Sequence, residues 1–378
     1  MHGLTRNPFN SKYTAGGSST GSAVGLAAGY APIALGSDTE GSMRGPSEYA
    51  GVAGLRPTLG RYSDAGVVPC NIARDTAGVM ASTVADVAAL DAIVMGAAIS
   101  EYKAATLGEV KVAVPKDWMA LAEKSPGTTK ALELAIEAFL GGGATVKKEV
   151  PDFKPLLAPP AGTSPEDSVY EKLSFRSEGL DAYIASHPNI GRTTDEVVGK
   201  SFYPNVARFF NAPILPTGAP MTNMKEKKGT DEYKELKEKY DKEVAAMAEA
   251  FAKYMDDAGV DVILSPCTTG PPSPALTSAE YSDPTTFGPL IVGSIGKYAP
   301  IFGLNGVAIP SITIPTAARH ENPELGGGPM PAGILLWGKP KEDKKLIEVA
   351  MALEKALAAG AKPPEGSLTK DPSKPTIG

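Results

Sequence analysis

Two clusters of glycine and serine near the start of the chain constrain it more than any other feature of its sequence. The first is Gly16–Ser19 and the second is Gly41–Ser42, and the short segment between them is apolar. Glycine is needed where a backbone turns sharply or approaches another group closely, and serine supplies a hydroxyl that can attack a substrate. A packed core requires neither feature, so the two clusters predict a functional site.

A serine hydroxyl is a weak nucleophile and needs a base, together with N–H donors for the oxyanion that forms on attack. Histidine is the usual base, but His2 lies at the extreme N-terminus of this sequence and His187 and His320 have turn-like contexts, so all three are expected to be solvated loop residues. The letters of a G-x-S-x-G nucleophile elbow occur around Ser19, yet the preceding segment is polar and is not the buried strand that this motif follows. A pair of serines without histidine therefore remains as the predicted site.

Composition excludes several classes of protein. The net charge of −6 offers no basic surface for nucleic acid, and no apolar run reaches the roughly 18 residues of a membrane span. The opening residues, MHGLTRNPFN, lack the pattern of a secretory signal. Cys70 and Cys267 have no metal-ligand spacing, and both are expected to be small buried hydrophobes in a reducing compartment. We therefore expect a cytoplasmic protein that needs no metal and no cofactor.

Hydrophobic periodicity predicts an α/β protein. Apolar residues at spacings of three and four from Asp231 to Asp257 predict a long helix whose apolar stripe packs on the core. Buried apolar strands separated by helices favour a large, mixed, mostly parallel sheet covered by helices on both faces. Strands are expected at 32–35, 52–55, 66–68, 110–115, 260–266, 306–315 and 332–338, and a loop is expected at 37–46. Helices are expected at 21–30, 128–140 and 344–357, and a further helix is expected between an N-cap at Ser82 and a stop at Gly96.

The stretch GGSSTGSAVGLAAGYAPIALGSDTEGSMRGPSEYAGVAGLRPTLGR resembles the signature of the amidase signature family, whose members read GGSSGGS, then G-T-D-T-G-G-S-I-R-x-P, then G-L-(K/R)-P-T-x-G-R. The resemblance continues through RDTAGVMASTVADVAALDAIVMG, VDVILSPCTTGPPSP and GPMPAGILLWGKPKEDKKLIEVAMALE and spans nearly all of residues 4–357. It implies the amidase signature fold as one domain over residues 1–360, followed by a disordered tail at 361–378. Within the domain we expect a signature core at 1–100, a helical, substrate-side region at 101–230, and the long helix with a return to the sheet at 231–360.

The resemblance also implies roles for individual residues. Ser42 corresponds to the nucleophile that is acylated and Ser18 to the serine that passes on its proton, and their separation of 42 − 18 = 24 residues is that of the family. A cis peptide bond is expected before Ser18, with glycine preceding it because a side chain would crowd the turn. The implied oxyanion hole consists of the backbone N–H groups of Thr39, Glu40, Gly41 and Ser42, and the implied supporting residues are Gly17, Ser19, Asp38 and Arg44.

The chain departs from the family pattern in two places. Glu40 stands where most members have glycine, and its carboxylate is expected to point away, since a negative charge roughly 4 Å from the oxyanion would cost about 4 kcal/mol. The family's general base is a lysine in a G-I-P-x-x-x-K-D segment upstream of the first cluster, whereas only Lys12 precedes Ser18 here. Lys12 aligns with a non-catalytic stretch and is interpreted as a surface lysine. We therefore expect that the catalytic lysine segment is missing and that the chain has lost most of its amidase activity.

The reaction implied by the resemblance is hydrolysis of a carboxamide to a carboxylate and ammonia. The segment RDTAGVMASTVADVAALD is closer to the branch that hydrolyses arylalkyl amides such as indoleacetamide or mandelamide. Two alternatives stay open, a lysine-less, non-catalytic pseudoenzyme and a glutamyl-tRNA amidotransferase subunit of the A type. The expected partner is a small-molecule amide, with no direct contact to nucleic acid, and a homodimer is left open. Aromatic residues that suit an acyl pocket as well as a core are Phe202, Tyr203, Phe209 and Phe210.

Overall fold

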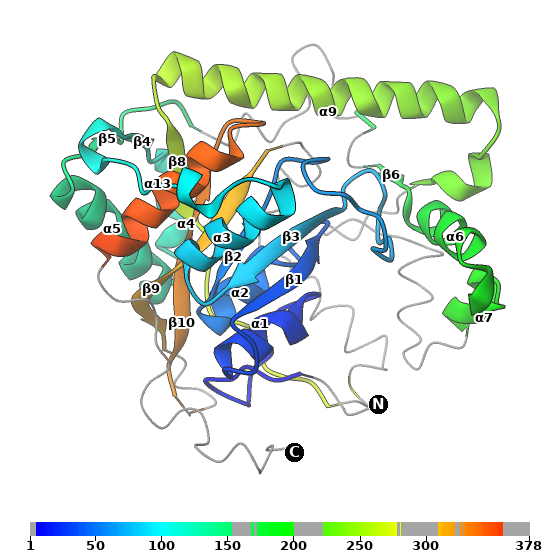
Figure 1. Cartoon of the computed structure of the whole chain (residues 1–378), viewed down its shortest axis with the longest axis horizontal. Helices are drawn as coiled ribbons and strands as arrows, with labels where there is room; N and C mark the ends of the chain where they lie inside the picture. Colours follow the sequence, from blue (N-terminus) through cyan, green and yellow to red (C-terminus); the bar gives the residue numbers. More distant parts are fainter. Residues whose placement is uncertain are drawn as a thin grey trace.

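The computed structural model describes residues 5–152, 168–169, 172–199, 222–277, 280, 309–321, 326 and 328–357. Its main sheet has eight strands in the order β1-β3-β2-β9-β10-β8-β4-β5 (Figure 1). These strands are β1 Ile33–Asp38, β2 Ala53–Arg56, β3 Thr76–Ala81, β4 Lys111–Ala113, β5 Thr145–Lys147, β8 Val262–Pro266, β9 Ser311–His320 and β10 Met330–Trp337. The helices are α1 Thr20–Ala27, α2 Arg44–Ala50, α3 Val84–Met95, α4 Lys116–Ala122, α5 Pro126–Gly141, α6 Arg176–Ser186, α7 Thr194–Gly199, α9 Asp231–Ala258 and α13 Asp343–Ala356.

The main sheet is mixed, as expected, but the expectation that it is mostly parallel is wrong for the described strands. β4 pairs in parallel with β5 and β8. Every other neighbouring pair, from β1 through β3, β2, β9 and β10 to β8, is antiparallel. A continuous apolar run indicates that a strand is buried on both faces, and a covered antiparallel strand has the same pattern as a parallel one. The sequence pattern therefore predicted burial correctly and strand direction incorrectly.

Helices cover both faces of this sheet. Val262 and Leu264 of β8 pack in one core cluster with α3, α5 and α13, whereas Ile263 packs in a second cluster with α9. This division follows from the strand itself, because successive side chains point to opposite faces.

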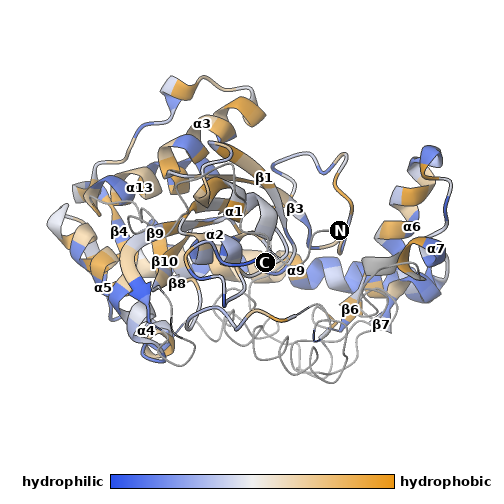
Figure 2. Cartoon of the chain, turned by 90° about the horizontal axis from the view of Figure 1, so that it is seen from below, coloured by the Kyte–Doolittle hydropathy of each residue, from blue (hydrophilic) through white to orange (hydrophobic). Residues whose placement is uncertain are grey.

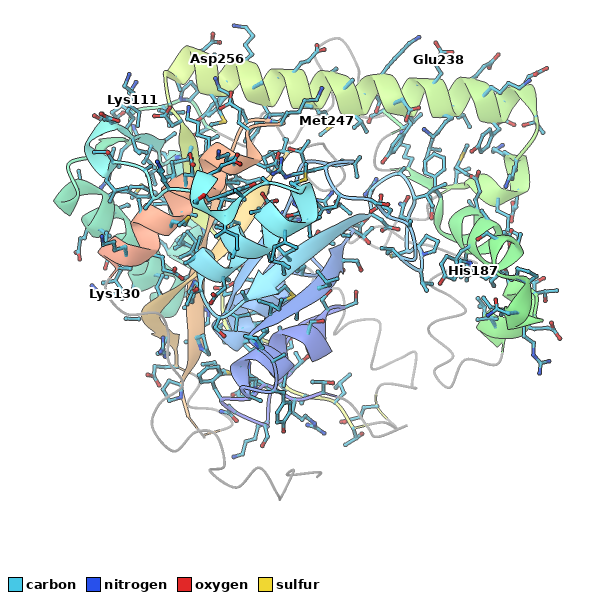
Figure 3. The ribbon with its side chains drawn as sticks, viewed as in Figure 1. Lys111, Lys130, His187, Glu238, Met247 and Asp256 are labelled. Atoms are coloured by element: carbon cyan, nitrogen blue, oxygen red, sulfur yellow. The ribbon has the colours of Figure 1, made fainter. Side chains whose placement is uncertain are left out.

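The long helix α9 follows its predicted bounds closely and lies across the top of the molecule in Figure 1. Its apolar stripe, including Tyr240, Met247 and Phe251, belongs to the second core cluster, which confirms the interpretation of the stripe as core packing. Figure 3 shows Met247 on the side of α9 that faces the body of the protein, with Glu238 and Asp256 on its outer side. Figure 2 shows α6 and α7 beside the far end of α9, apart from the main sheet.

The structure corrects several local expectations. Residues 66–68 form no strand, and the unanticipated strand β3 lies between β1 and β2. The glycine within β3, Gly78, resembles a turn signal in the sequence, but a Cβ at this position would lie 2.5 Å from the backbone oxygen of Leu55. Close approach of two strands therefore explains this glycine.

The start of α3 differs from its expected position, and the helix α2 was not anticipated. Thr83, not Ser82, caps α3, and its hydroxyl accepts a hydrogen bond from the Asp86 N–H. Gly96 ends that helix in the left-handed conformation, as expected. The expected loop at 37–46 is shorter in the structure, because β1 continues to Asp38 and α2 begins at Arg44.

Candidate active site

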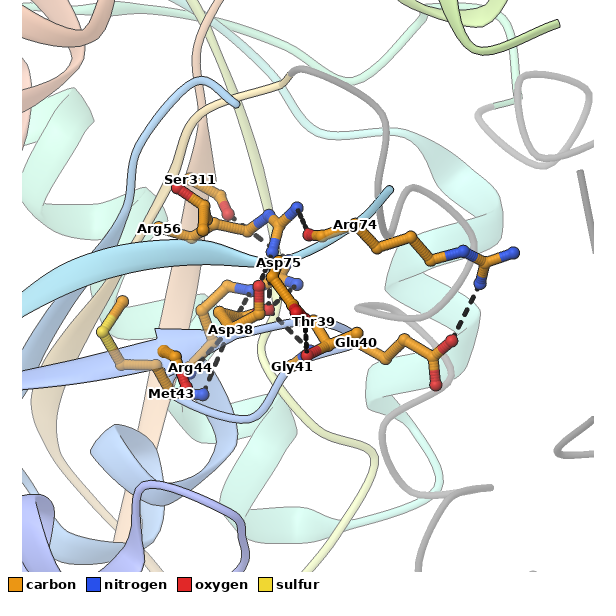
Figure 4. Close-up of polar contacts among 12 residues, drawn as sticks. Asp38, Thr39, Glu40, Gly41, Met43, Arg44, Arg56, Arg74, Asp75 and Ser311 are labelled. Carbon is orange, nitrogen blue, oxygen red and sulfur yellow. Dashed lines mark hydrogen bonds and ion pairs between the residues drawn. The ribbon is translucent and has the colours of Figure 1, made fainter. Parts of the chain in front are cut away.

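The second glycine–serine cluster lies in the loop of residues 38–44, which joins the end of β1 to the start of α2. We name it the nucleophile loop after the role expected for Ser42. The carboxylate of the buried Asp38 accepts hydrogen bonds from the N–H groups of Gly41 at 2.8 Å, Met43 at 3.2 Å and Arg44 at 3.3 Å (Figure 4). Gly41 has a φ of 105°, which side chains rarely permit. The three hydrogen bonds to this one carboxylate thus hold the loop in a turn, and Ser42 is half-buried within it.

Two buried guanidinium groups neutralise Asp38. Arg44 donates to it from Nε and Nη2, both at 3.0 Å, and Arg56 donates from Nη1 at 3.0 Å. Burial by itself would raise the pKa of Asp38, but Arg44 and Arg56 outweigh it and hold the pKa well below its ordinary value of 3.8. The loop is therefore built on an ionised aspartate. This geometry suits the orienting roles expected for Asp38 and Arg44, which remain predictions.

The first cluster packs directly against the nucleophile loop. The Ser19 N–H donates to the backbone oxygen of Ser42 at 2.8 Å. The Ser19 hydroxyl donates to the backbone oxygen of Ser37 and accepts from its N–H, both at 3.1 Å, so it is engaged with β1. Ser18 is exposed, and the peptide bond between Gly17 and Ser18 is cis, as the resemblance implied. These contacts keep Ser18 and Ser42 on neighbouring segments.

Backbone conformation explains one of the two glycines of the first cluster. A Cβ at Gly17 would meet only the Thr20 hydroxyl, at an ordinary contact distance of 3.7 Å. Gly16 has a φ of 77°, a conformation that favours glycine. The requirement at Gly16 is therefore backbone conformation, whereas the expectation of a crowded cis turn at Gly17 stays a prediction.

The four predicted oxyanion donors are not equivalent. The N–H of Gly41 is already bonded to Asp38, so in this structure it supports the loop. The side chain of Thr39 is turned to Asp75, with 2.5 Å between the hydroxyl and the carboxylate. The backbone N–H groups of Thr39, Glu40 and Ser42 remain the candidates for contact with an oxyanion.

A second segment, Cys70–Thr76, holds the nucleophile loop from its other side. The carboxylate of Asp75 binds the Thr39 hydroxyl with one oxygen and the N–H groups of Cys70, at 2.8 Å, and Asn71, at 2.7 Å, with the other. Burial raises the pKa of Asp75, while these hydrogen bonds act in the opposite direction. Asp75 therefore links the turn at Cys70 and Asn71 to Thr39, the residue that follows Asp38.

Arg74, the neighbour of Asp75, holds the next residue of the nucleophile loop. Its Nη1 donates to the Glu40 carboxylate at 2.8 Å, and its Nε donates to the Tyr240 hydroxyl of α9 at 3.2 Å. Figure 4 shows both side chains extending away from Asp38, which agrees with the expectation that Glu40 points away. Sequence reasoning missed the site role of Arg74 and Asp75, although the pair RD directly before an apolar segment was a usable signal.

Comparison with known proteins agrees with this arrangement. A family model described as Amidase matches residues 1–347. The chain belongs to the amidase signature family. A solved structure of an amidase family protein from Bacillus anthracis superposes with a TM-score of 0.62 at 19% identity, over 95% of this chain and 64% of that one. The expected amidase signature fold, with a large mixed sheet flanked by helices, is thereby confirmed.

Two curated relatives have different named activities. The A-type subunit of the Thermus thermophilus glutamyl-tRNA(Gln) amidotransferase is 29% identical over 374 residues, which are 94% of this chain and 70% of that protein. The mandelamide hydrolase of Pseudomonas putida is 28% identical over 372 residues, 95% of this chain and 65% of that protein. This amidase signature chain therefore spans about two thirds of the length of the relatives that it matches.

The position of His320 differs from the expected one. His320 is buried at the end of β9, where its Nδ1 lies 3.3 Å from the Ser125 hydroxyl and its Nε2 lies 3.6 Å from the Glu48 carboxylate. The expectation of a solvated loop is wrong for His320, because β9 extends through Arg319 to His320 itself. His187 is half-buried after α6 and stacks on Tyr183, and His2 lies outside the described residues.

The remaining residues named from the sequence are assigned no catalytic role. Cys267 is buried, and burial raises the pKa of its thiol well above the ordinary value, which agrees with a small hydrophobic role, whereas Cys70 is only half-buried. Lys12 is exposed, as expected. The aromatic residues expected near an acyl pocket, Phe202, Tyr203, Phe209 and Phe210, lie outside the described residues.

The described parts of the chain hold neither a membrane-spanning helix nor a metal-binding cluster. No helix there is both long enough and apolar enough to cross a bilayer. No three histidine, cysteine, aspartate or glutamate side chains within those ranges are grouped as a metal ion would require. The absence of a cofactor stays a prediction.

The pairing of Glu40 with Arg74 leads to a testable prediction. The Arg74→Ala variant should lower kcat/KM for an amide about tenfold, because the Glu40 carboxylate then adds unneutralised negative charge beside the oxyanion donors. Adding Glu40→Gly should restore part of the rate, since it removes that charge. Steady-state kinetics of the single and double variants test this, with Arg192→Ala, which breaks an exposed pair with Glu196, as a silent control. A double variant slower than Arg74→Ala would contradict the prediction.

Proposed function

We propose that this protein hydrolyses a carboxamide through an acyl-enzyme on Ser42. The observation that most directly supports this proposal is the contact between the two clusters, in which the Ser19 N–H donates to the backbone oxygen of Ser42 at 2.8 Å. It keeps Ser18 on the segment next to a loop that is built on an ionised Asp38. Membership of the amidase signature family supports the same reaction class, hydrolysis of a C–N bond.

In the proposed reaction, the Ser42 hydroxyl oxygen bonds to the amide carbonyl carbon while Ser18 accepts its proton. The N–H groups of Thr39, Glu40 and Ser42 donate to the oxyanion. The C–N bond then breaks, the nitrogen takes up a proton and leaves as ammonia, and water hydrolyses the Ser42 ester to a carboxylate. The base implied for Ser18 is the lysine of the family pattern, and the exposed Lys12 is not assigned that role.

For the substrate we propose an arylalkyl amide. The similarity to a mandelamide hydrolase over 95% of this chain supports this choice, together with the RDTAGVMASTVADVAALD segment. A glutamyl-tRNA amidotransferase A-type subunit is a second candidate, favoured by the comparable similarity to the Thermus thermophilus protein. Release of ammonia from mandelamide and indoleacetamide, measured beside release from glutamine, distinguishes the two.

The direct test is covalent labelling. Incubation with a small fluorophosphonate, followed by peptide mapping, should place the adduct on Ser42, because a positioned serine with oxyanion donors reacts as a nucleophile. Heat-unfolded protein is the control and should not be labelled. An adduct on Ser19 with none on Ser42 would contradict the proposal.

A further inference from the structure

A cavity of about 310 Å³ lies between the segment that holds the nucleophile loop and helix α6. Val67 and Pro69 line it from just before this segment, Ile72 lines it from the segment itself, and Ala182 and Tyr183 line it from α6. The helix approaches this segment very closely at Gly179, where a Cβ would lie 2.5 Å from the Ile72 side chain. The absence of a side chain at Gly179 thus lets α6 form one wall of the cavity.

One residue is shared between this cavity and the candidate active site. Asp75 lines the cavity, and its carboxylate also binds the hydroxyl of Thr39 at 2.5 Å. Thr39 belongs to the nucleophile loop and supplies one of the proposed oxyanion donors. A ligand in the cavity would therefore touch the residue that fixes this loop.

The lining residues indicate the chemistry of the ligand. The five wall residues are apolar or aromatic, and the Ile72 side chain is 46% exposed, so a hydrophobic group would gain by covering it. The charged lining residues are Asp64 and Asp75, and no cationic side chain lines the cavity among the described residues. Its volume is at the lower end of small-molecule sites. These features suit an uncharged or cationic ring and disfavour a group that carries a carboxylate.

We propose that this cavity is the subsite for the apolar ring of the amide substrate. The inference rests on the proposed function at Ser42 and adds to it the residues that select the substrate. Asp75 is then the residue that both bounds the subsite and positions the nucleophile loop.

Filling the cavity provides the test. Ala182→Phe places a ring in the cavity from α6, whereas Ala185→Phe adds the same side chain at an exposed position of α6 that does not line it. We expect Ala182→Phe to raise the Kd of phenylacetamide, measured by calorimetry, and its KM at least about tenfold. The loss for acetamide should be smaller than the loss for phenylacetamide, because acetamide carries no ring, and fluorophosphonate labelling of Ser42 should persist. Ala185→Phe should leave all four measurements unchanged.

A second variant keeps the test decisive if Ala182→Phe fails to fold. Ile72→Glu places a charge on an exposed wall of the cavity and should also weaken phenylacetamide binding at least about tenfold. Unchanged phenylacetamide binding in a folded variant, or an equal loss for phenylacetamide and acetamide, would overturn the inference. A different result would separate the two proposals. If Ser42 of the unmodified protein is not labelled, but Ala182→Phe still weakens phenylacetamide binding, the proposed function is refuted and the binding site stands.

Discussion

In a version of the protein that carries the family's lysine segment, replacing Ser42 with alanine should lower carboxamide turnover by roughly 10⁴-fold or more, because the acyl-enzyme can then no longer form. Ser18→Ala should cost about 10² to 10⁴, the usual contribution of positioned proton transfer. The two losses should not add, since both serines serve one step. The measurement is kcat/KM from ammonia release, with mandelamide as the first substrate.

A serine outside the proposed machinery is the matched control. Ser22 lies in α1, and its hydroxyl donates to the backbone oxygen of Leu35 at 2.7 Å. Ser22→Ala removes this bond and should lower the free energy of unfolding by about 1 kcal/mol without changing turnover. Turnover that survives in Ser42→Ala, or that disappears in Ser22→Ala, would be incompatible with Ser42 as the nucleophile.

Asp38→Asn should destabilise the protein by about 3 to 5 kcal/mol, the largest stability effect that we expect from a single change. The substitution keeps the size of the side chain and removes its charge. The side chains of Arg44 and Arg56 are only 0% and 1% exposed. In the variant, these two buried cations would lose the carboxylate of residue 38 with which both form ion pairs. Chemical denaturation followed by circular dichroism measures the change in the free energy of unfolding.

The pH dependence of stability gives the same prediction a second readout. The pKa of Asp38 is held below its ordinary value in the folded state. Near and below pH 4, the Asp38 carboxyl therefore binds a proton more readily in the unfolded chain than in the folded protein. Its contribution is therefore complete above about pH 4 and is lost as the pH falls toward the folded pKa. Asp38→Asn should lack this part of the acid sensitivity.

An exposed aspartate separates this effect from a general loss of charge. Asp241 pairs with Lys237 on the surface of α9, and Asp241→Asn should cost no more than about 0.5 kcal/mol. An Asp38→Asn variant as stable as Asp241→Asn would show that the two buried guanidinium groups do not depend on Asp38.

The sequence by itself determined those features that depend on neighbouring residues. The stripe of α9 was predictable because its residues recur with the period of a helix, and the fold was predictable because the two glycine–serine clusters carry a specific family signature. The left-handed stop at Gly96 and the positive φ of Gly41 follow from the conformational freedom of glycine, which is a local property.

Only the tertiary structure decided the features that join distant segments. Arg74 and Asp75 act on Glu40 and Thr39 across more than thirty residues of chain, so no local pattern reveals the pairing. The antiparallel order around β3 and the burial of His320 likewise depend on which segments become neighbours. The physical reason is common to all three: hydrophobic burial is readable from a strand's own residues, but hydrogen-bond partners and strand direction are set by the segments packed beside it.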